Sequence, residues 1–321
     1  MHLSIILHLA VATACLFMAT SCSETPPMRL ADIRRAPQGF IELSGDRLPN
    51  TRVDLNHARR TAEPMDADSI ELTVYRDEPH YFPVDMCHRA NEMLNAFRVT
   101  SDSAFLRNAE RYVRKLQSLS VRVDSALFVQ HLMNYYLHGN NGVHLIPPWV
   151  SGMAQGEFLG VAVRCFETTG DSSYLALAHQ LFNSLRRLQT DGRPWVSRID
   201  DDRYFWIEEF PHETRPGMTL NGYIAALFGV YDYYRLTKSD AALALYEASL
   251  TTIKHYLPQF RRPGNFSYYC LGHKSPANAD YHNLHISMCR HLHRMTGDDF
   301  FRDMADQLES DTSSQRADAE D

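Results

Sequence analysis

Two tyrosines in the C-terminal third of the sequence are well suited to proton transfer. Tyr269 lies in an aromatic segment, and Tyr281 opens the last long helical pattern. A tyrosine hydroxyl acts as a base or an acid near neutral pH when nearby cations or hydrogen bonds lower its pKa from about 10. A buried tyrosine more often packs with its hydroxyl bound and does no chemistry. The role of both residues therefore depends on what surrounds them.

His282 and His285 follow Tyr281 and stand three residues apart, so a helix would put both imidazoles on one face. Such a pair is able to hold a metal ion. The sequence has no HExxH motif and no evident third ligand nearby, so hydrogen bonding is the preferred interpretation. We expect both histidines to contact substrate, and we expect neither a metal nor a cofactor.

Glu208 and Glu209 end an aromatic segment that looks extended. Adjacent side chains of a strand point to opposite faces, so these carboxylates cannot form the acid and base pair of a glycoside hydrolase. One glutamate is expected to face a pocket among aromatic side chains. The alternative is an exposed edge strand with one solvated glutamate and the other paired to an arginine just upstream, among Arg193, Arg198 and Arg203.

The segment Pro147–Gly156 predicts a helix start beside a cavity. Ser151 is a good N-cap, because its side-chain oxygen can accept a hydrogen bond from the first turn. Trp149 would stand at the mouth of the site, and Gln155 would face the cavity. A capped helix with a packing tryptophan and a closely approached Gly156 is the simpler interpretation.

A repeated turn indicates how these segments are positioned. Its threonines are spaced 69, 68 and 59 residues apart, and each turn separates two patterns with apolar residues at helical spacing. The copies are Thr100-Ser101-Asp102, Thr169-Gly170-Asp171, Thr237-Lys238-Ser239-Asp240 and Thr296-Gly297-Asp298. The Asp or Ser is expected to cap the second helix.

Helical hairpins must stack to bury their apolar faces. We therefore predict an all-α fold over residues 81–308, an α/α toroid or incomplete barrel whose long connections line one mouth. An open superhelix of helix pairs is the alternative.

The two ends of the chain are predicted to lie outside this helical domain. Residues 1–21 resemble a secretory signal peptide of lipoprotein type, with cleavage before Cys22 and lipidation of its thiol. Residues 22–80 are expected to form an extended arm with short strands at 40–43 and 70–75. Residues 309–321 are predicted to be disordered. These features predict export to the periplasm or anchoring at the bacterial outer membrane, with membrane contact only through the lipid.

The composition excludes several classes of protein. The chain has 321 residues, 44% of them hydrophobic, and a net charge of −7. These values are typical of a globular protein and argue against sequence-independent nucleic-acid binding. The cysteines beyond Cys22 have no zinc-type spacing and are expected to be buried. Whether two of them form a disulfide stays open. The oligomeric state also stays open, a homodimer included.

Taken together and in order, these segments resemble the D-glucuronyl C5-epimerase family, in its C-terminal catalytic domain. The resemblance covers roughly residues 83–305. The matching text is Trp149-x-Ser151-x-Met153-Ala154-Gln155-Gly156, Glu208-Glu209-Phe210-Pro211, Leu220-Asn221-Gly222, Gly229-x-Tyr231-Asp232, Ser267-x-Tyr269-x-Leu271 and Tyr281-His282-x-x-His285-Ile286. It implies an α/α toroid and a uronic-acid polysaccharide, heparosan-like, as the partner.

The resemblance also implies roles for single residues. Tyr269 and Tyr281 match tyrosines that move the C5 proton of glucuronic acid to give iduronic acid. Glu209 matches the active-site glutamate. The substrate-binding residues that we expect are Trp149, Gln155, Asn221, Arg215, His282 and His285.

Two departures from the family pattern weaken the match. Phe210 stands where family members have a tyrosine, which removes a hydroxyl. Gly272 stands where some members have an arginine, which removes a cation; Arg215, His273 or His282 could replace it. A polysaccharide lyase, which begins with the same proton removal, and a non-catalytic glycan-binding lipoprotein are therefore the alternatives.

Overall fold

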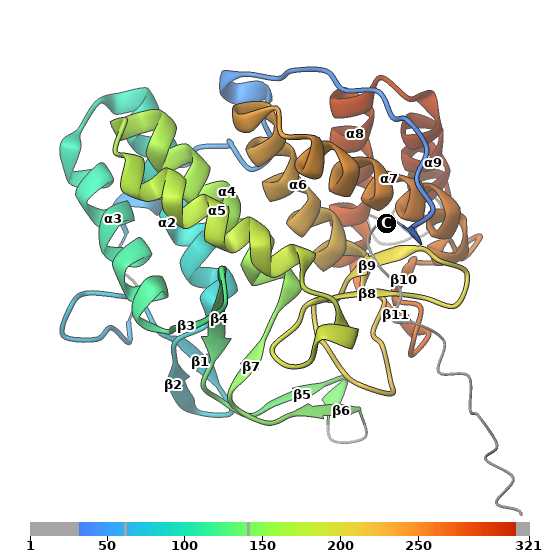
Figure 1. Ribbon diagram of the computed structural model, residues 1–321, viewed down its shortest axis with the longest axis horizontal. Coiled ribbons are helices and arrows are strands. Elements are labelled where there is room, and N and C mark those ends of the chain that lie inside the picture. Colours follow the sequence, from blue (N-terminus) through green and yellow to red (C-terminus); the bar gives the residue numbers. More distant parts are fainter. Residues whose placement is uncertain (1–31, 61–62, 140–141, 313–321) are drawn as a thin grey trace, which may run out of the picture.

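Eight helices pair into four hairpins in a computed structural model that describes residues 32–60, 63–139 and 142–312 (Figure 1). The predicted signal peptide, Cys22 and residues 313–321 lie outside these described residues. The hairpins are α2 (Pro83–Thr100) with α3 (Ser103–Ser118), α4 (Gly152–Thr169) with α5 (Ser172–Arg186), α6 (Leu220–Thr237) with α7 (Asp240–Phe260), and α8 (Ala279–Thr296) with α9 (Asp299–Ser310).

The repeated turn folds as the sequence predicts, by local hydrogen bonds. In the first copy Thr100 donates to the carbonyl of Ala96 and accepts from the backbone N–H of Asp102, whose carboxylate caps α3 at the N–H of Ala104. Equivalent bonds form around Thr169 and Thr296. The residue after the first helix of each hairpin adopts the left-handed conformation that commonly ends a helix. In the third copy, the N-cap Ser239 makes no side-chain capping bond.

Helices α2, α4, α6 and α8 contact one another in that order, and each has its hairpin partner packed against it. Every residue from 152 to 165 and from 220 to 233 is buried. The sequence pattern approximated one apolar face, but α4 and α6 are surrounded by neighbouring helices on all sides. Gly156 and Gly229 let these two helices meet, since a Cβ at Gly229 would lie 1.8 Å from the carbonyl oxygen of Gly156.

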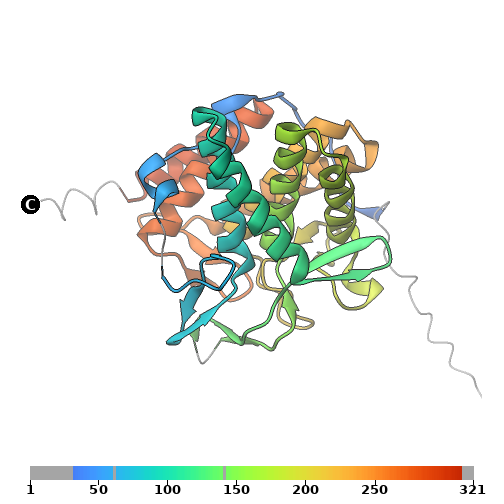
Figure 2. The same cartoon turned by 90° about the vertical axis from the view of Figure 1, so that its left-hand side faces the viewer.

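The N-terminal arm crosses the end of the helices where the four turns lie (Figures 1 and 2). The hydroxyl of Tyr231 donates to the carbonyl of Ile41 and accepts from the N–H of Leu43. These bonds hold the chain extended but leave no ladder partner, so the predicted strand at 40–43 is wrong. The predicted strand at 70–75 is confirmed in part, because β1 (Thr73–Tyr75) forms a hairpin with β2 (Glu78–His80). The arm also contains a short 3-10 helix and α1 (Leu55–Arg59).

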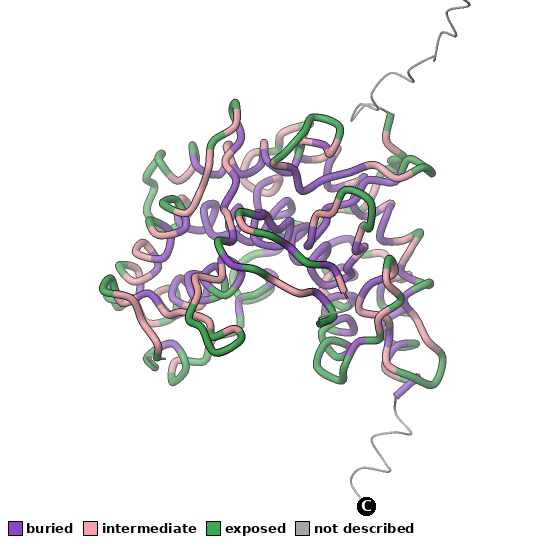
Figure 3. The backbone as a smooth tube through the Cα atoms, turned by 90° about the horizontal axis from the view of Figure 1, so that it is seen from below, coloured by how far each residue is buried: buried purple, intermediate pink, exposed green. Residues whose placement is uncertain are grey.

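The long connections gather at the opposite end, which we call the connection end (Figures 1 and 3). They form small antiparallel sheets. These are β3 (Ser120–Val123), β4 (Ala126–His131) and β7 (Trp149–Val150); β5 (Tyr135–Leu137) and β6 (Val143–Leu145); β8 (Ser197–Ile199) and β9 (Phe205–Ile207); and β10 (Tyr268–Cys270) and β11 (Ser275–Pro276).

The described C-terminal residues correct the predicted domain boundary. Helix α9 runs to Ser310, and Asp311 forms an ion pair with Arg261, with Nε 2.7 Å from Oδ2. The prediction that residues 309–321 are disordered is therefore wrong for residues 309–312, because a long-range ion pair holds them on the fold. None of the described helices is long and apolar enough to span a membrane.

Candidate active site at the connection end

Glu208 and Glu209 follow β9 directly and have opposite surroundings. Glu208 is fully buried and accepts from Arg198 Nε at 2.7 Å and from the backbone N–H of Met218 at 2.9 Å. Its charge is thus compensated within the fold, as expected for the glutamate that pairs with an upstream arginine. Glu209 lies on the other side, against an aromatic cluster.

Glu209 is a buried carboxyl group, and it forms no ion pair with any other described residue. Both carboxylate oxygens lie 3.5 Å from the Tyr269 hydroxyl. Burial, and next the nearby Glu157 charge, raise the pKa of Glu209 to about 8, against the smaller opposing effect of the Tyr269 hydrogen bond. Near neutral pH this group can therefore both give and accept a proton.

Tyr269 and Tyr281 lie together beside Glu209. Their rings meet edge to face with centroids 4.8 Å apart. Tyr281 is 40% exposed, whereas Tyr269 is largely buried. Burial and the Glu209 charge raise the pKa of both hydroxyls. No cation among the described residues lowers these pKa values, so both tyrosines rest as neutral hydroxyls.

A third tyrosine, Tyr135 on β5, joins this group and was missed by the sequence analysis. Its ring stacks on Phe210 with centroids 5.4 Å apart and an interplanar angle of 6°. Burial and then the charge of Glu209 raise the pKa of Tyr135. Its position in a connection without helical periodicity gave no signal, because a hairpin between β4 and β7 brings it to the site.

Trp149 supports this wall of the site. It is buried, stacks on His131 with centroids 3.8 Å apart, and donates its indole N–H to the carbonyl of Met133. The pKa of the buried His131 falls to about 3, so this ring is neutral. Trp149 therefore packs under the aromatic cluster and does not stand open at the mouth.

The first turn of α6 makes room for Glu209. A Cβ at Gly222 would lie 2.2 Å from Oε2 of Glu209, so only glycine fits there without a shift. Asn221 beside it is 2% exposed, and its side-chain oxygen has no hydrogen-bond partner among the described residues. The motif Leu220-Asn221-Gly222 thus forms part of the site wall.

Glu157 on α4 is a second buried carboxylate near Glu209, and it was not predicted. Its Oε1 lies 2.8 Å from Nε2 of His88, whose pKa its charge raises to about 9. His88 is thus an imidazolium near neutral pH. His88 also lines a cavity of about 670 Å³ between α1, α2 and β1, together with Asp85.

Gln155 does not fit the predicted substrate contact. Its side chain is fully buried, accepts from the N–H of Val129, and donates to the carbonyl of Leu127 and to Ser184. These bonds satisfy the edge of β4 and fix it to α4. The predicted N-cap is confirmed, with Ala154 N donating to Ser151 Oγ at 3.3 Å.

His282 and His285 also face inward instead of toward a substrate. His282 accepts from the N–H of Ser267 at 2.9 Å and reaches the carbonyl of Leu308 at 3.0 Å. Nδ1 of His285 lies 2.8 Å from Ser267 Oγ, and burial lowers its pKa to about 3. Both rings hold the residue that precedes β10, so they position Tyr269 from behind.

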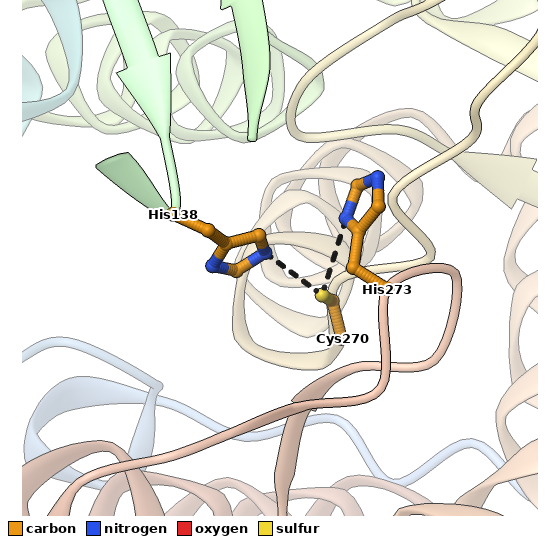
Figure 4. A group of neighbouring side chains, drawn as sticks. All are labelled: His138, Cys270 and His273. Atoms are coloured by element: carbon orange, nitrogen blue, oxygen red, sulfur yellow. Dashed lines mark hydrogen bonds between the residues drawn. The ribbon is translucent and has the colours of Figure 1, made fainter. Parts of the chain in front are cut away.

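Arg215 is exposed and forms no ion pair among the described residues. It lies near His273 and His212, and its charge contributes to lowering the pKa of both. Other arginines of this end are occupied: Arg193 pairs with Glu213, and Arg203 lies 3.8 Å from Asp32. His273 itself joins His138 and Cys270 in a cluster of metal-ligand type (Figure 4).

Comparison with known proteins identifies the family of the chain. The family model described as D-glucuronyl C5-epimerase C-terminus matches residues 124–310. A D-glucuronyl C5-epimerase of Caenorhabditis elegans is 29% identical over 181 residues, which are 50% of this chain and 28% of that protein. An uncharacterized protein of Methanocaldococcus jannaschii is 32% identical over 155 residues, 48% of this chain and 49% of that protein. The chain thus spans half or less of the length of these relatives.

Two solved structures share the helical fold at low identity. Cellobiose 2-epimerase from Bacillus thermoamylovorans has a TM-score of 0.51 at 13% identity, over 75% of this chain and 64% of that one. The Lin0763 protein from Listeria innocua also has a TM-score of 0.51 at 13% identity, over 71% and 60%. These matches bear on the fold alone. With more than half of its residues matched by the family model, the chain belongs to the D-glucuronyl C5-epimerase C-terminus family.

Proposed function

We propose that this protein is a carbohydrate epimerase that inverts C5 of D-glucuronic acid units in a heparosan-like polysaccharide. The observation that carries the proposal is the buried Glu209, which has no cationic partner among the described residues and contacts Tyr269, with Tyr281 and Tyr135 around it. The hydrogen at C5 is weakly acidic, since its loss adds charge next to a carboxylate. An enzyme for this step needs proton-transfer groups on both faces of the ring.

Glu209 and Tyr269 act together on one face of the sugar. The C5–H bond breaks, the proton passes to the Tyr269 oxygen, and the hydroxyl proton of Tyr269 passes to the Glu209 carboxylate. The electron pair of the bond enters the enediolate of the uronate. A pKa of about 8 makes Glu209 a far better acceptor than an ordinary carboxylate, and the 3.5 Å contact supplies the path.

Tyr281 acts on the opposite face. It is more exposed than Tyr269, and its raised pKa keeps it protonated, so it is able to donate its hydroxyl proton to C5 of the enediolate. The tyrosinate that remains recovers a proton from solvent, and Glu209 releases to solvent the proton that it accepted. One solvent proton therefore enters the product at C5, and the configuration there is inverted.

Two neighbouring residues compensate for the departures from the family pattern. Tyr135, stacked on Phe210, returns a hydroxyl to the side of Glu209 where Phe210 lacks one. Arg215, exposed near the site and outside the ion pairs of the described residues, supplies the cation for the substrate carboxylate that Gly272 lacks. The hairpins form an arc of an α/α toroid whose connections shape this binding face.

Deuterium incorporation tests the proposal. We expect protein incubated with heparosan in deuterated water to place deuterium at C5 and to form iduronate, both read by NMR. Tyr281→Phe should lower the rate about 100-fold or more, because the donated proton is lost. Tyr246→Phe is the matched control, since this hydroxyl bonds the carbonyl of Gly39 at the far end of the molecule.

The same experiment separates the alternatives. An unsaturated product that absorbs in the ultraviolet would identify a lyase. No exchange with any of several uronate polymers, together with binding that Tyr281→Phe weakens, would identify a glycan-binding protein instead.

A further inference from the structure

His138, Cys270 and His273 converge next to the proposed active site but take no part in the proton transfers (Figure 4). Nε2 of His138 lies 3.1 Å from Sγ of Cys270, and Nδ1 of His273 lies 3.5 Å from the same sulfur. The three ligand atoms all fall within 4.8 Å of one another. The other described cysteines, Cys87, Cys165 and Cys289, are buried on helices, outside this group.

A tight backbone arrangement brings Cys270 and His273 together. The segment after β10 pairs with the chain before α6, where Leu271 N donates to Met218 O and Gly272 N donates to Gly217 O. A Cβ at Gly272 would lie 1.9 Å from the carbonyl oxygen of Pro216, so the close crossing depends on glycine. The turn that follows places the His273 ring back over the Cys270 sulfur.

His138 comes from the hairpin of β5 and β6, 132 residues earlier in the chain. Its ring also meets the Tyr269 ring edge to face, with centroids 5.9 Å apart. The cluster is thus built from two separate connections, and it borders the residue that contacts Glu209.

The donor set of the group favours a metal over a nucleophile. One cysteine sulfur and two imidazole nitrogens are ligands that zinc takes in proteins, and here all three atoms lie within reach of one ion. Cys270 is fully buried, so its sulfur is poorly placed to attack an external substrate.

The distances suit a tetrahedral ion. Tetrahedral zinc separates a thiolate sulfur from an imidazole nitrogen by roughly 3.5–3.6 Å, because the bonds are about 2.3 and 2.0–2.1 Å long. The contact of the Cys270 sulfur with His273 is 3.5 Å and matches this separation, and its contact with His138 is 3.1 Å, so that ring would move by about 0.4 Å on binding. Nε2 of His273 is buried without a hydrogen-bond partner among the described residues, so the ring has no competing bond that would turn Nδ1 away.

We propose that His138, Cys270 and His273 form a zinc site with a fourth position open to water or an anionic oxygen. Binding releases the thiol proton of Cys270 to solvent, so the zinc with its thiolate carries a net charge of +1, which suits an anionic oxygen in the fourth position. The bound ion would tie the hairpin of β5 and β6 to β10. This inference does not depend on the epimerase reaction, because it concerns metal affinity.

Cobalt substitution tests the site directly. In a Cys15→Ser/Cys22→Ser background, which removes the thiols outside the described residues, we expect one equivalent of Co²⁺ to give a thiolate-to-metal absorption band that Zn²⁺ abolishes. Titration calorimetry should give the same stoichiometry for Zn²⁺. The melting temperature should rise with Zn²⁺, since a ligand that binds only the folded chain stabilises it.

Matched variants make the result specific. Cys270→Ser should abolish the absorption band, and His273→Ala or His138→Ala should weaken Zn²⁺ binding at least about 10-fold. Cys289→Ser and His144→Ala, in α8 and in the same hairpin as His138, should leave it unchanged. A chain that binds no Co²⁺ or Zn²⁺, or a Cys270→Ser variant that binds as tightly as the parent, would reduce the cluster to a hydrogen-bonded thiol and overturn the proposal.

Discussion

The two ends of the helical hairpins use buried polar groups in opposite ways. At the turn end, Arg164 pairs with Asp232 at 3.0 Å and also donates to Asn91 and to the carbonyl of Pro49. At the connection end, Glu209 is buried, accepts a hydrogen bond from the Tyr269 hydroxyl, and has a second carboxylate, Glu157, nearby. Charge is compensated at the first end, whereas at the second end Glu209 is buried without a cation among the described residues.

The same contrast appears between two neighbouring residues. Glu208 has Arg198 and a backbone N–H, whereas Glu209 has Tyr269 and the aromatic wall. A fold has no energetic reason to bury a carboxylate without a cation, since this costs several kcal/mol or raises its pKa. The difference indicates which glutamate stabilises the protein and which one is available for chemistry.

Replacing Glu209 should separate activity from stability most sharply. Glu209→Gln is expected to lower kcat/KM for C5 exchange about 1000-fold, because the proton acceptor is lost. The same variant should be more stable than the parent at pH 9, by about 2–4 kcal/mol. With its pKa raised from 4.5 to about 8, the folded parent keeps a proton that the unfolded chain releases, so the parent loses stability between these pH values.

Urea unfolding at pH 6, 7.5 and 9 measures the second effect. A Glu209→Gln variant that becomes less stable as pH rises, relative to the parent, would mean that Glu209 is paired like Glu208. The contrast between the two glutamates would then fail.

Replacing Arg198 should produce the opposite result at the neighbouring glutamate. Arg198→Met leaves Glu208 buried without its cation and is expected to lower the free energy of unfolding by about 3–5 kcal/mol at pH 7. The double variant Arg198→Met/Glu208→Gln should recover most of this loss, because no buried charge remains. Denaturant unfolding checks both; a single variant as stable as the parent would refute the structural role of the pair.

Replacing Glu157 should change the pH dependence of the reaction. The parent is expected to show kcat/KM rising with pH through about 8, as Glu209 becomes the carboxylate that accepts a proton. Glu157→Gln removes a neighbouring negative charge, so the pKa of Glu209 falls and the rise should move to lower pH. The pKa of His88 should also fall from about 9 toward 6.5, read by NMR titration of its ring protons.

Glu92→Gln is the control for that shift, because Glu92 pairs with His57 and Arg89 instead. If Glu157→Gln leaves the pH profile in place, Glu157 is not part of the electrostatics of the site.

The smallest effect is expected at the turn end. Asp102→Ala removes the N-cap of α3 and should lower the free energy of unfolding by about 1 kcal/mol, measured with urea. The rate of C5 exchange should stay that of the parent, because the turn lies at the far end of the helices. A changed rate would show that the two ends are coupled.

Local sequence determined the repeated turns almost completely. Thr100, Asp102 and their counterparts bond to residues two to four positions away, so a short motif contains both partners. The cap at Ser151 and the divergence of Glu208 from Glu209 could be predicted for the same reason. The family resemblance added Tyr269, Tyr281 and Glu209, which the structure brings together.

Only the tertiary structure decided the surroundings of these residues. Tyr135 reaches Phe210, His88 reaches Glu157 and His138 reaches Cys270 across 69 to 132 residues of chain. No periodicity or cap encodes such pairs, because they form where separate connections meet. Burial decided the rest: Gln155, His282 and His285 carry polar groups suited to a substrate, but the packing of α4 and α8 turns them to backbone partners and Ser267 inside the fold.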